Sequence, residues 1–149
     1  MHKILFVCTG NTCRSPMAAA IAEDALKKQG VSAYVSSCGI FAEQGAKVSI
    51  NSVTAVKKLM GIDISAHNSK TAEDEDIISA HIIITMTHGH KRHLVTIYPN
   101  FAEKIFTIKE LCGEEHDIND PFGGSEALYM NCAEQLKRYI EKLNWEEIL

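Results

Sequence analysis

The residues best suited to chemistry lie near the amino terminus, in the segment Cys8–Ser15, which reads CTGNTCRS. This segment directly follows the apolar run Ile4–Val7, typical of a buried strand, and precedes a helical pattern over Pro16–Lys28. Backbone N–H groups at the start of a helix converge and carry partial positive charge, so a loop in this place predicts an anion site. Pro16 at the first helical position, preceded by Ser15, is the expected signature of a helix start.

Arg14 and Cys8 supply the reactive groups of this loop. The planar guanidinium of Arg14 can hold two oxygens of a phosphate at once, and the positive field of the loop would stabilise the Cys8 thiolate as a nucleophile. The spacing predicts a phosphatase that works through a cysteinyl-phosphate. A cysteine that ends a buried strand can also be a small core residue. The residues expected to surround the phosphate are Thr9, Gly10, Asn11, Thr12, Cys13, Arg14 and Ser15.

Two further side chains would take part in the reaction. Ser15 can donate a hydrogen bond to the Cys8 sulfur, which keeps the sulfur ionised and helps it leave in the second step. Asp120, in the pair Asp120–Pro121, could protonate the leaving group and then deprotonate the attacking water. An aspartate before a proline is also a common turn former, and the residues alone leave both interpretations open.

The two motifs resemble those of the low-molecular-weight protein tyrosine phosphatases. The loop of that family reads C-x-G-N-x-C-R-S-P near the amino terminus, and Cys8–Pro16 matches it in register. The second motif of the family is an Asp-Pro pair late in the chain, which Asp120–Pro121 matches. The resemblance covers essentially the whole chain and favours the acid role of Asp120 over the turn role. It implies that the catalytic residues are Cys8, Arg14 and Asp120.

The resemblance also implies residues that shape the loop rather than touch the substrate. Asn11 suits a left-handed backbone position, and in the family the matching residue is held by a serine and a downstream histidine, here Ser37 and His67. An exposed loop histidine is the alternative for His67. Family members can also join the nucleophile to a second loop cysteine in a reversible disulfide that protects it from oxidation. Cys8 and Cys13 would form this redox pair, with a packed, inert Cys13 as the alternative.

Two positions at the rim of the predicted site bear on the substrate. Phosphotyrosine-selective family members carry a bulky aliphatic residue where this chain has Thr12, and a tyrosine or tryptophan where it has Phe122. These two residues, with the segments 86–91 and 120–125, are more similar to the bacterial protein arginine phosphatase branch. A phosphoarginine guanidinium is rich in N–H donors, which a threonine hydroxyl can accept and an aliphatic wall would leave unpaired. We therefore favour a phosphoarginine protein as substrate, with a phosphotyrosine protein as the alternative.

Two other classes of protein fit the anion loop less well. Thioredoxin-coupled arsenate reductases share the fold and a similar loop, but they relay a disulfide through further cysteines downstream, and the stretch Ile82–His93 contains none. A purely anion-binding module would gain nothing from the reactive set of Cys8, Arg14 and Asp120. A phosphatase is the interpretation that uses every residue of the two motifs.

Composition places the chain among soluble globular proteins. Its 149 residues, 46% hydrophobic and 23% charged, predict a single phosphatase domain over residues 1–149. The net charge of −4 argues against nucleic acid and anionic membranes as partners, so we expect a phosphorylated protein as partner and a monomer. No apolar stretch approaches the ~20 residues of a membrane span. Met1–Lys3 leads straight into a strand rather than a signal peptide, and a cytoplasmic location is expected.

The remaining cysteines and histidines do not predict a metal site, and we expect neither a metal nor a cofactor. The five cysteines form no C-x-x-C pair, which argues against a disulfide framework or a zinc site and for a reducing compartment. The histidines of segment 88–93 share no helical face, and we expect solvated side chains that could lie at the substrate rim: His88, His90 and His93. The other cysteines are expected to be buried thiols: Cys38, Cys112 and Cys132.

Strand and helix patterns alternate along the chain. Strands are expected over Lys3–Cys8, Ala33–Ser37, Ile82–Met86 and Ile105–Ile108. Helices are expected over Pro16–Lys28, Val48–Met60, Thr71–Ser79 with Thr71 as its cap, His88–Ile97 and Ser125–Leu143. This order predicts a three-layer α/β fold with a central four-stranded parallel twisted sheet and helices on both faces. Ligands of such sheets bind at the carboxyl ends of the strands, where the Cys8 loop begins.

Overall fold

The computed structural model describes residues 1–149 and contains a four-stranded sheet with the strand order β2-β1-β3-β4. All neighbouring strands are parallel, and Cys8 at the end of β1 lies beside Gly39 at the end of β2. The strands are β1 (His2–Cys8), β2 (Ala33–Gly39), β3 (Ile82–Thr85) and β4 (Ile105–Thr107). β1 is therefore an inner strand that leads into the Cys8 loop at its carboxyl end.

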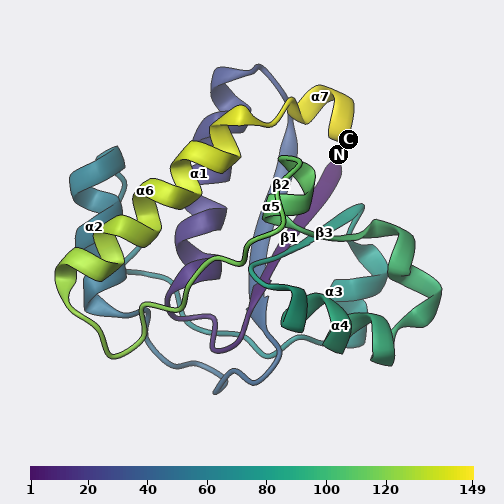
Figure 1. Ribbon diagram of the computed structural model, residues 1–149, viewed down its shortest axis with the longest axis horizontal. Coiled ribbons are helices and arrows are strands. Elements are labelled where there is room, and N and C mark those ends of the chain that lie inside the picture. The colour runs from purple at the N-terminus through teal and green to yellow at the C-terminus, as the bar shows by residue number, and fades with distance from the viewer.

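Helices cover both faces of the sheet (Figure 1). One side carries α1 (Arg14–Lys28), α2 (Ile50–Met60) and α6 (Glu126–Lys142). The other side carries α3 (Asp74–Ser79) and α4 (His88–Ile97). The short helical segments are η1 (Pro99–Lys104, a 3-10 helix), α5 (Ile108–Leu111) and α7 (Trp145–Ile148). The predicted three-layer α/β fold with a four-stranded parallel sheet is confirmed.

Alternation along β1 divides the core between the two faces of the sheet. Ile4 and Phe6 join a cluster of 26 buried residues on the side of α1 and α6. Leu5 and Val7 belong to a cluster of 8 buried residues on the side of α3 and α4. A strand that is covered on both faces must be apolar at every position, which explains the unbroken apolar run that precedes Cys8. Because β1 is packed on both faces, its position is fixed, and so is the point at which the Cys8 loop begins.

The start of α1 differs from the prediction. The helix begins at Arg14, so Pro16 occupies its third position, and the expected helix start at Pro16 is wrong. Proline is tolerated there because the N–H groups of the first helical turn have no acceptor within the helix. Arg14 and Ser15 therefore belong to the first turn of α1, where both are buried.

Two other helix starts also needed correction. α2 begins two residues later than predicted, because the Ser49 hydroxyl accepts a hydrogen bond from the Ser52 N–H and caps the helix. Thr71 does not cap α3; instead Glu73 and Asp76 form a reciprocal capping box that starts the helix three residues later. The other predicted strand and helix ends lie within two residues of the observed ones. The three short helical segments were not predicted, because four to six residues are too few to show a helical period.

All five cysteines are free thiols. Cys38 and Cys132 are buried as predicted, and burial raises the pKa of each to about 12, so both stay protonated at neutral pH. The expectation of a buried thiol is wrong for Cys112, which follows α5 and is only half-buried. Its sulfur lies 3.4 Å from the carbonyl oxygen of Tyr139 on α6.

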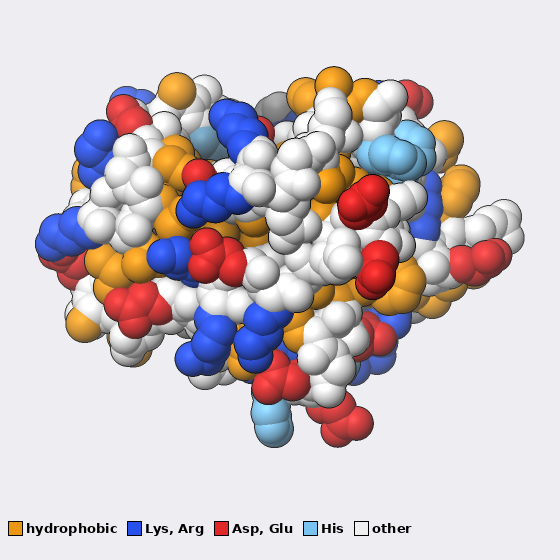
Figure 2. Space-filling view, turned by 90° about the horizontal axis from the view of Figure 1, so that it is seen from above, with side chains coloured by type: hydrophobic (Ala, Val, Ile, Leu, Met, Phe, Trp, Pro, Cys, Tyr) orange, Lys and Arg blue, Asp and Glu red, His pale blue; other side chains and the backbone are white.

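The amino-terminal edge of the sheet, opposite the Cys8 loop, carries a mixed surface (Figure 2). Basic and acidic side chains lie next to one another there, with hydrophobic side chains between them. None of the helices is both long and apolar enough to cross a lipid bilayer.

Gly39 ends β2 at the point where the Cys8 loop approaches most closely. A Cβ atom at this position would lie 2.5 Å from the Thr9 carbonyl oxygen and 2.9 Å from the Ala42 Cβ. The two strands run in register to the same edge, so their loops pack backbone against backbone and leave no room for a side chain. Gly39 is therefore part of what positions the loop.

We predict that Gly39→Ala lowers the free energy of unfolding by about 2 kcal/mol, because overpacking usually costs roughly 1–3 kcal/mol. Urea denaturation measures the change. Gly89→Ala is the matched control, because its Cβ would meet nothing closer than the Thr87 hydroxyl at 3.5 Å, an ordinary contact. Equal stability of the two variants would contradict the role given to Gly39.

Candidate active site

The predicted reactive residues line one cavity of about 250 Å³ at the carboxyl edge of the sheet. Its walls come from the segment between β1 and α1 and from the connection that precedes α6. The lining residues are Cys8, Thr9, Gly10, Thr12, Cys13, Arg14, Asp120 and Phe122. The two other predicted loop residues, Asn11 and Ser15, are fully buried and support the cavity without lining it.

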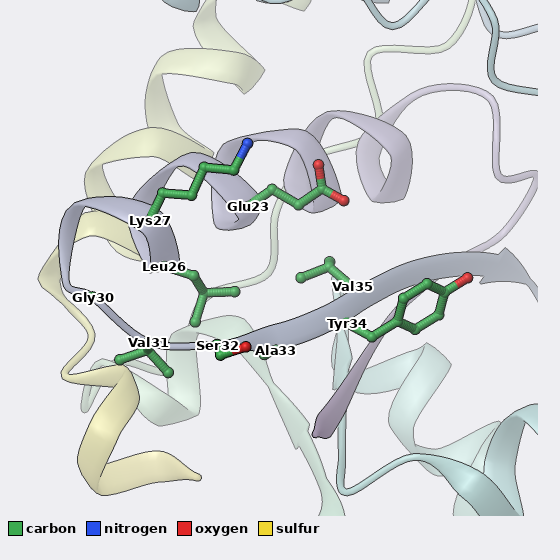
Figure 3. Close-up of a pocket in the computed structure, with 9 residues that line it drawn as sticks. All are labelled: Glu23, Leu26, Lys27, Gly30, Val31, Ser32, Ala33, Tyr34 and Val35. Carbon is green, nitrogen blue, oxygen red and sulfur yellow. The ribbon is translucent and has the colours of Figure 1, made fainter.

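A larger hollow of about 460 Å³ lies at the far end of α1, between that helix and the start of β2 (Figure 3). Leu26 and Val35 lie in the space between helix and strand, and Glu23 and Lys27 extend from the helix. The lining of this hollow contains no cysteine, histidine or arginine, so it offers neither a thiol nucleophile nor a bidentate phosphate clamp. The smaller cavity is therefore the candidate active site.

Cys8 is 2% exposed, and its sulfur has two hydrogen-bond partners. Ser15 Oγ is 2.8 Å from the sulfur, and the Asn11 N–H donates to it over 3.3 Å. Burial raises the pKa of the Cys8 thiol above its ordinary value, whereas the hydrogen bonds from Ser15 and Asn11 and the charge of Arg14 lower it. Desolvation therefore opposes the field that we expected to stabilise the thiolate, and the reactivity of Cys8 depends on the groups that counter it.

Asn11 holds the loop in shape. It is fully buried with a φ of 57°, in the left-handed region. Its side-chain amide donates to Ser15 Oγ (2.8 Å) and Ser37 Oγ (2.9 Å), and its side-chain oxygen accepts from the Lys70 N–H (2.9 Å). The backbone oxygen of Asn11 lies 3.0 Å from His67 Nε2. The structure thus places Ser37 and His67 where the family resemblance implied, and half-buries His67 rather than exposing it.

The direction of the hydrogen bond between Ser15 and Cys8 follows from this network. Ser15 Oγ already accepts from the Asn11 amide, so its single hydrogen is free to be donated. The other acceptor in reach, the Cys38 carbonyl oxygen, is 3.5 Å away, whereas the Cys8 sulfur is at 2.8 Å. Ser15 therefore donates to Cys8, which stabilises the thiolate.

Arg14 and Asp120 lie next to each other in the wall of the cavity. Arg14 is 4% exposed; its Nη1 donates to the Ile118 carbonyl oxygen over 2.9 Å, and its Nη2 lies 3.5 Å from Asp120 Oδ2. The other carboxylate oxygen of Asp120 accepts from the Phe122 N–H over 3.0 Å, which closes a turn. The two interpretations of Asp120 are therefore compatible, because one oxygen forms the turn while the other faces the cavity.

A family model described as low molecular weight phosphotyrosine protein phosphatase matches residues 3–148. The chain belongs to this family. It is 41% identical over 143 residues to a protein-arginine-phosphatase of Geobacillus stearothermophilus, and the match covers 95% of this chain and 93% of the relative. The family resemblance that the two motifs indicated is confirmed.

Solved structures of this phosphatase family agree with the assignment. The chain matches the low molecular weight protein tyrosine phosphatase from T. tengcongensis with a TM-score of 0.93 and 44% identity, and all of both chains is covered. It matches a mutant of the arginine phosphatase YwlE that has a phosphorylated active-site serine with a TM-score of 0.90 and 35% identity, covering 94% of this chain and 91% of that one. Relatives of this chain thus include proteins named for each of the two substrates considered from the sequence.

Cys13, the second cysteine of the phosphatase loop, is 6% exposed and lines the same cavity as Cys8. Its sulfur lies 3.3 Å from the hydroxyl of Tyr129 on α6, and burial raises the pKa of that hydroxyl. Both loop cysteines are reduced in the structure, so the reversible disulfide between them stays a prediction.

His90 is buried, so the expectation of a solvated side chain is wrong for this residue. It is 5% exposed, and its Nε2 lies 2.8 Å from Thr9 Oγ1 in the phosphatase loop. Burial and the nearby charge of Arg14 lower the pKa of His90 to about 4. His88 and His93 are partly exposed, and no group of three His, Cys, Asp or Glu side chains is arranged to hold a metal ion.

An aromatic residue that the sequence analysis missed lies beside the loop. Phe41 is 70% exposed; its N–H donates to the Thr9 carbonyl oxygen over 3.0 Å, and its ring centroid is 5.1 Å from that of His93. Phe122, which is 77% exposed, lines the cavity as the motif indicated. No local pattern marks Phe41, because only the pairing of β1 with β2 brings it to the loop.

We predict that Ser15→Ala raises the pKa of Cys8 further, because the variant removes a hydrogen bond that lowers this pKa while burial stays the same. At any pH below the pKa a smaller fraction of Cys8 is then ionised, so alkylation slows and its pH midpoint moves upward. Iodoacetamide labelling of the Cys8 peptide, followed by mass spectrometry, measures the midpoint.

The matched control for this experiment is Thr54→Ala, which removes a hydroxyl that bonds only to the Ile50 carbonyl oxygen within α2, at a solvent-exposed position. The control should leave the midpoint of Cys8 alkylation unchanged. If Ser15→Ala also leaves it unchanged, the Ser15 hydroxyl does not act on the sulfur.

Proposed function

We propose that the chain is a cysteine-dependent protein phosphatase that removes the phosphoryl group from phosphoarginine side chains. The observation that carries the proposal is the arrangement around one sulfur, where Cys8 receives the Ser15 hydrogen bond in a cavity shared with Arg14 and Asp120. Family membership and the 41% identity to a protein-arginine-phosphatase support the same chemistry.

In the first step, the Cys8 thiolate attacks the phosphorus in line, the S–P bond forms and the bond from phosphorus to the guanidino nitrogen breaks. Asp120, in its protonated form, gives its proton to the leaving nitrogen. The backbone N–H groups of the loop and the Arg14 guanidinium hold the three non-bridging oxygens, on which charge spreads in the transition state. The products of this step are a free arginine side chain and a cysteinyl-phosphate.

In the second step, a water molecule attacks the phosphorus of the cysteinyl-phosphate. The Asp120 carboxylate takes a proton from this water, the S–P bond breaks and inorganic phosphate leaves. The Ser15 hydroxyl, which points at the sulfur, stabilises the departing Cys8 thiolate. A phosphorylated active-site serine in the YwlE mutant supports a phosphoenzyme intermediate at the matching place.

The choice of phosphoarginine rests on Thr12. This residue lines the cavity, and the nearest partner of its hydroxyl is the Cys13 sulfur at 3.7 Å, a weak contact. The oxygen is therefore free to accept from a guanidinium N–H that enters the cavity. An aliphatic side chain in its place would leave that donor unpaired, at a cost of about 1–3 kcal/mol.

Phosphotyrosine is the second candidate substrate, and the rim of the cavity favours it. Phe122 lines the cavity, and Phe41 is bonded to the loop through its N–H and the Thr9 carbonyl oxygen. Both side chains are largely exposed, and aromatic rings in such positions can pack against a phenol ring. The 44% identical structure from T. tengcongensis is named for tyrosine. The same residues Cys8, Arg14 and Asp120 would serve, with the phenolic oxygen as leaving atom.

The proposal also covers the location, domain organisation and oligomeric state of the enzyme. We place the enzyme in the cytoplasm, because five free cysteines suit a reducing compartment. We propose one domain over residues 1–149 that acts as a monomer on phosphorylated proteins, without a metal or a cofactor. Phosphate chemistry of this kind needs only the loop donors, the thiol and the carboxyl group.

We predict that Asp120→Asn lowers kcat for a phosphorylated peptide by about 10²–10⁴-fold, the usual contribution of a general acid. The amide keeps the turn, because its oxygen can still accept from the Phe122 N–H, but it has no proton to give at neutral pH. Stopped-flow or steady-state phosphate release measures the rate. Full activity of Asp120→Asn with a poor leaving group would leave Asp120 with the turn role alone.

We predict that Thr12→Val lowers kcat/KM for a phosphoarginine peptide by about tenfold, the value of one hydrogen bond, and leaves a phosphotyrosine peptide unaffected. Valine matches threonine in shape and lacks only the hydroxyl. Thr12→Ser, which keeps the hydroxyl, should retain the preference of the wild type, and Thr12→Ile should reverse it. Paired kinetics with both peptides, using Cys8→Ser as the inactive control, decide between the substrates. A wild-type preference for phosphotyrosine that Thr12→Val does not change would overturn the phosphoarginine assignment.

A further inference from the structure

His90 is a buried titratable side chain that contacts the loop, and the proposed reaction gives it no role. It lies in the first turn of α4, where Thr87 caps the helix by accepting a hydrogen bond from the His90 N–H. Its Nε2 lies 2.8 Å from Thr9 Oγ1, whereas its Nδ1 is buried without any partner. With a pKa lowered to about 4, the ring is neutral at pH 7.

The unpartnered Nδ1 decides which nitrogen carries the proton. A neutral imidazole has one N–H, and a buried N–H without an acceptor is rarer in proteins than a buried acceptor without a donor. The proton therefore lies on Nε2, which donates it to Thr9 Oγ1. Since Thr9 Oγ1 has no other partner in the protein, its own hydrogen remains free to be donated.

Thr9 is in a position to use that hydrogen. It lines the cavity next to Cys8, and its backbone is fixed from the other side, because its carbonyl oxygen accepts from the Phe41 N–H over 3.0 Å. α4 thus holds the side chain of Thr9 while the connection after β2 holds its backbone. A hydroxyl fixed as a donor at the mouth of an anion site adds a side-chain hydrogen bond to those of the loop N–H groups.

We propose that His90 is a positioning residue that orients the Thr9 hydroxyl as a hydrogen-bond donor to a phosphoryl oxygen held in the Cys8 loop. The inference rests on the proposed function in one respect, namely that the cavity holds a phosphoryl group. It adds a contact between the Thr9 hydroxyl and the phosphoryl group. It also assigns α4, which lies outside the loop, the role of orienting that hydroxyl through His90.

The test is the binding of inorganic phosphate to the full chain, measured by isothermal titration calorimetry at pH 7. Thr9→Val removes the donor and should weaken binding by roughly tenfold, since a hydrogen bond to a charged group is lost. His90→Phe keeps the buried ring but frees the hydroxyl to rotate, and should weaken binding by roughly 3–10-fold. His90→Gln offers an amide N–H in place of Nε2–H and should restore most of the affinity.

The double variant Thr9→Val/His90→Phe separates positioning from a merely structural role. If His90 acts through the Thr9 hydroxyl, the double variant binds phosphate no more weakly than Thr9→Val alone. Additive losses, an unchanged affinity in Thr9→Val, or no rescue by His90→Gln would each overturn the proposal. Thermal unfolding of every variant identifies changes that come from misfolding.

Measuring both phosphate affinity and phosphopeptide hydrolysis tests this inference separately from the proposed function. If the phosphate affinities follow the expected pattern but no phosphopeptide is hydrolysed, the roles of His90 and Thr9 stand and the proposed activity fails. If phosphopeptides are hydrolysed but the affinities do not follow the pattern, the activity stands and the positioning role fails. A wild-type protein that does not bind phosphate at all overturns both.

Discussion

The left-handed backbone of Asn11 is the constraint on which the active-site loop depends. Left-handed backbone costs an L-residue about 1–2 kcal/mol, and Asn11 is the only non-glycine residue with a positive φ. Two serine hydroxyls, a backbone N–H and a histidine ring hold it there. In this conformation the backbone N–H of Asn11 donates to the Cys8 sulfur over 3.3 Å. The same side chain also frees the hydrogen of Ser15 for the sulfur, so loop shape and thiol chemistry have one origin.

Arg14 shows how the protein prepares for an anion. Burying a guanidinium is costly unless it is well paired, and the structure gives Arg14 one protein hydrogen bond, to Ile118, and a carboxylate at 3.5 Å. Most of its five N–H donors therefore remain without a close protein acceptor. Donors that are already oriented toward the cavity need little reorganisation when charge develops on a phosphoryl group, which is the condition for strong electrostatic stabilisation.

The parts of the fold and site that could be predicted from the sequence are those with local causes. The unbroken apolar run of β1 and the loop motif each depend on residues within a short stretch of the chain, and the alternating strand and helix patterns are likewise local. Ser37 and His67 were found only through the family resemblance, because they lie 26 and 56 positions from Asn11. His90 was misjudged and Phe41 was missed because their burial and exposure depend on how α4 and the segment after β2 pack against the Cys8 loop. The sequence also could not predict the pKa of Cys8, because burial raises it while hydrogen bonds and Arg14 lower it, and the extent of burial is known only from the structure.

The long-range hydrogen bonds that hold the loop also determine when, during folding, the protein becomes active. Asn11 contacts residues 26, 56 and 59 positions away, and Thr9 contacts one 81 positions away. Such contacts close long stretches of chain and recover their entropy cost only when most of the structure has formed. A chain still leaving the ribosome therefore carries Cys8 and Arg14 without the cradle that makes them reactive, and the thiol acquires its chemistry only when the sheet is complete.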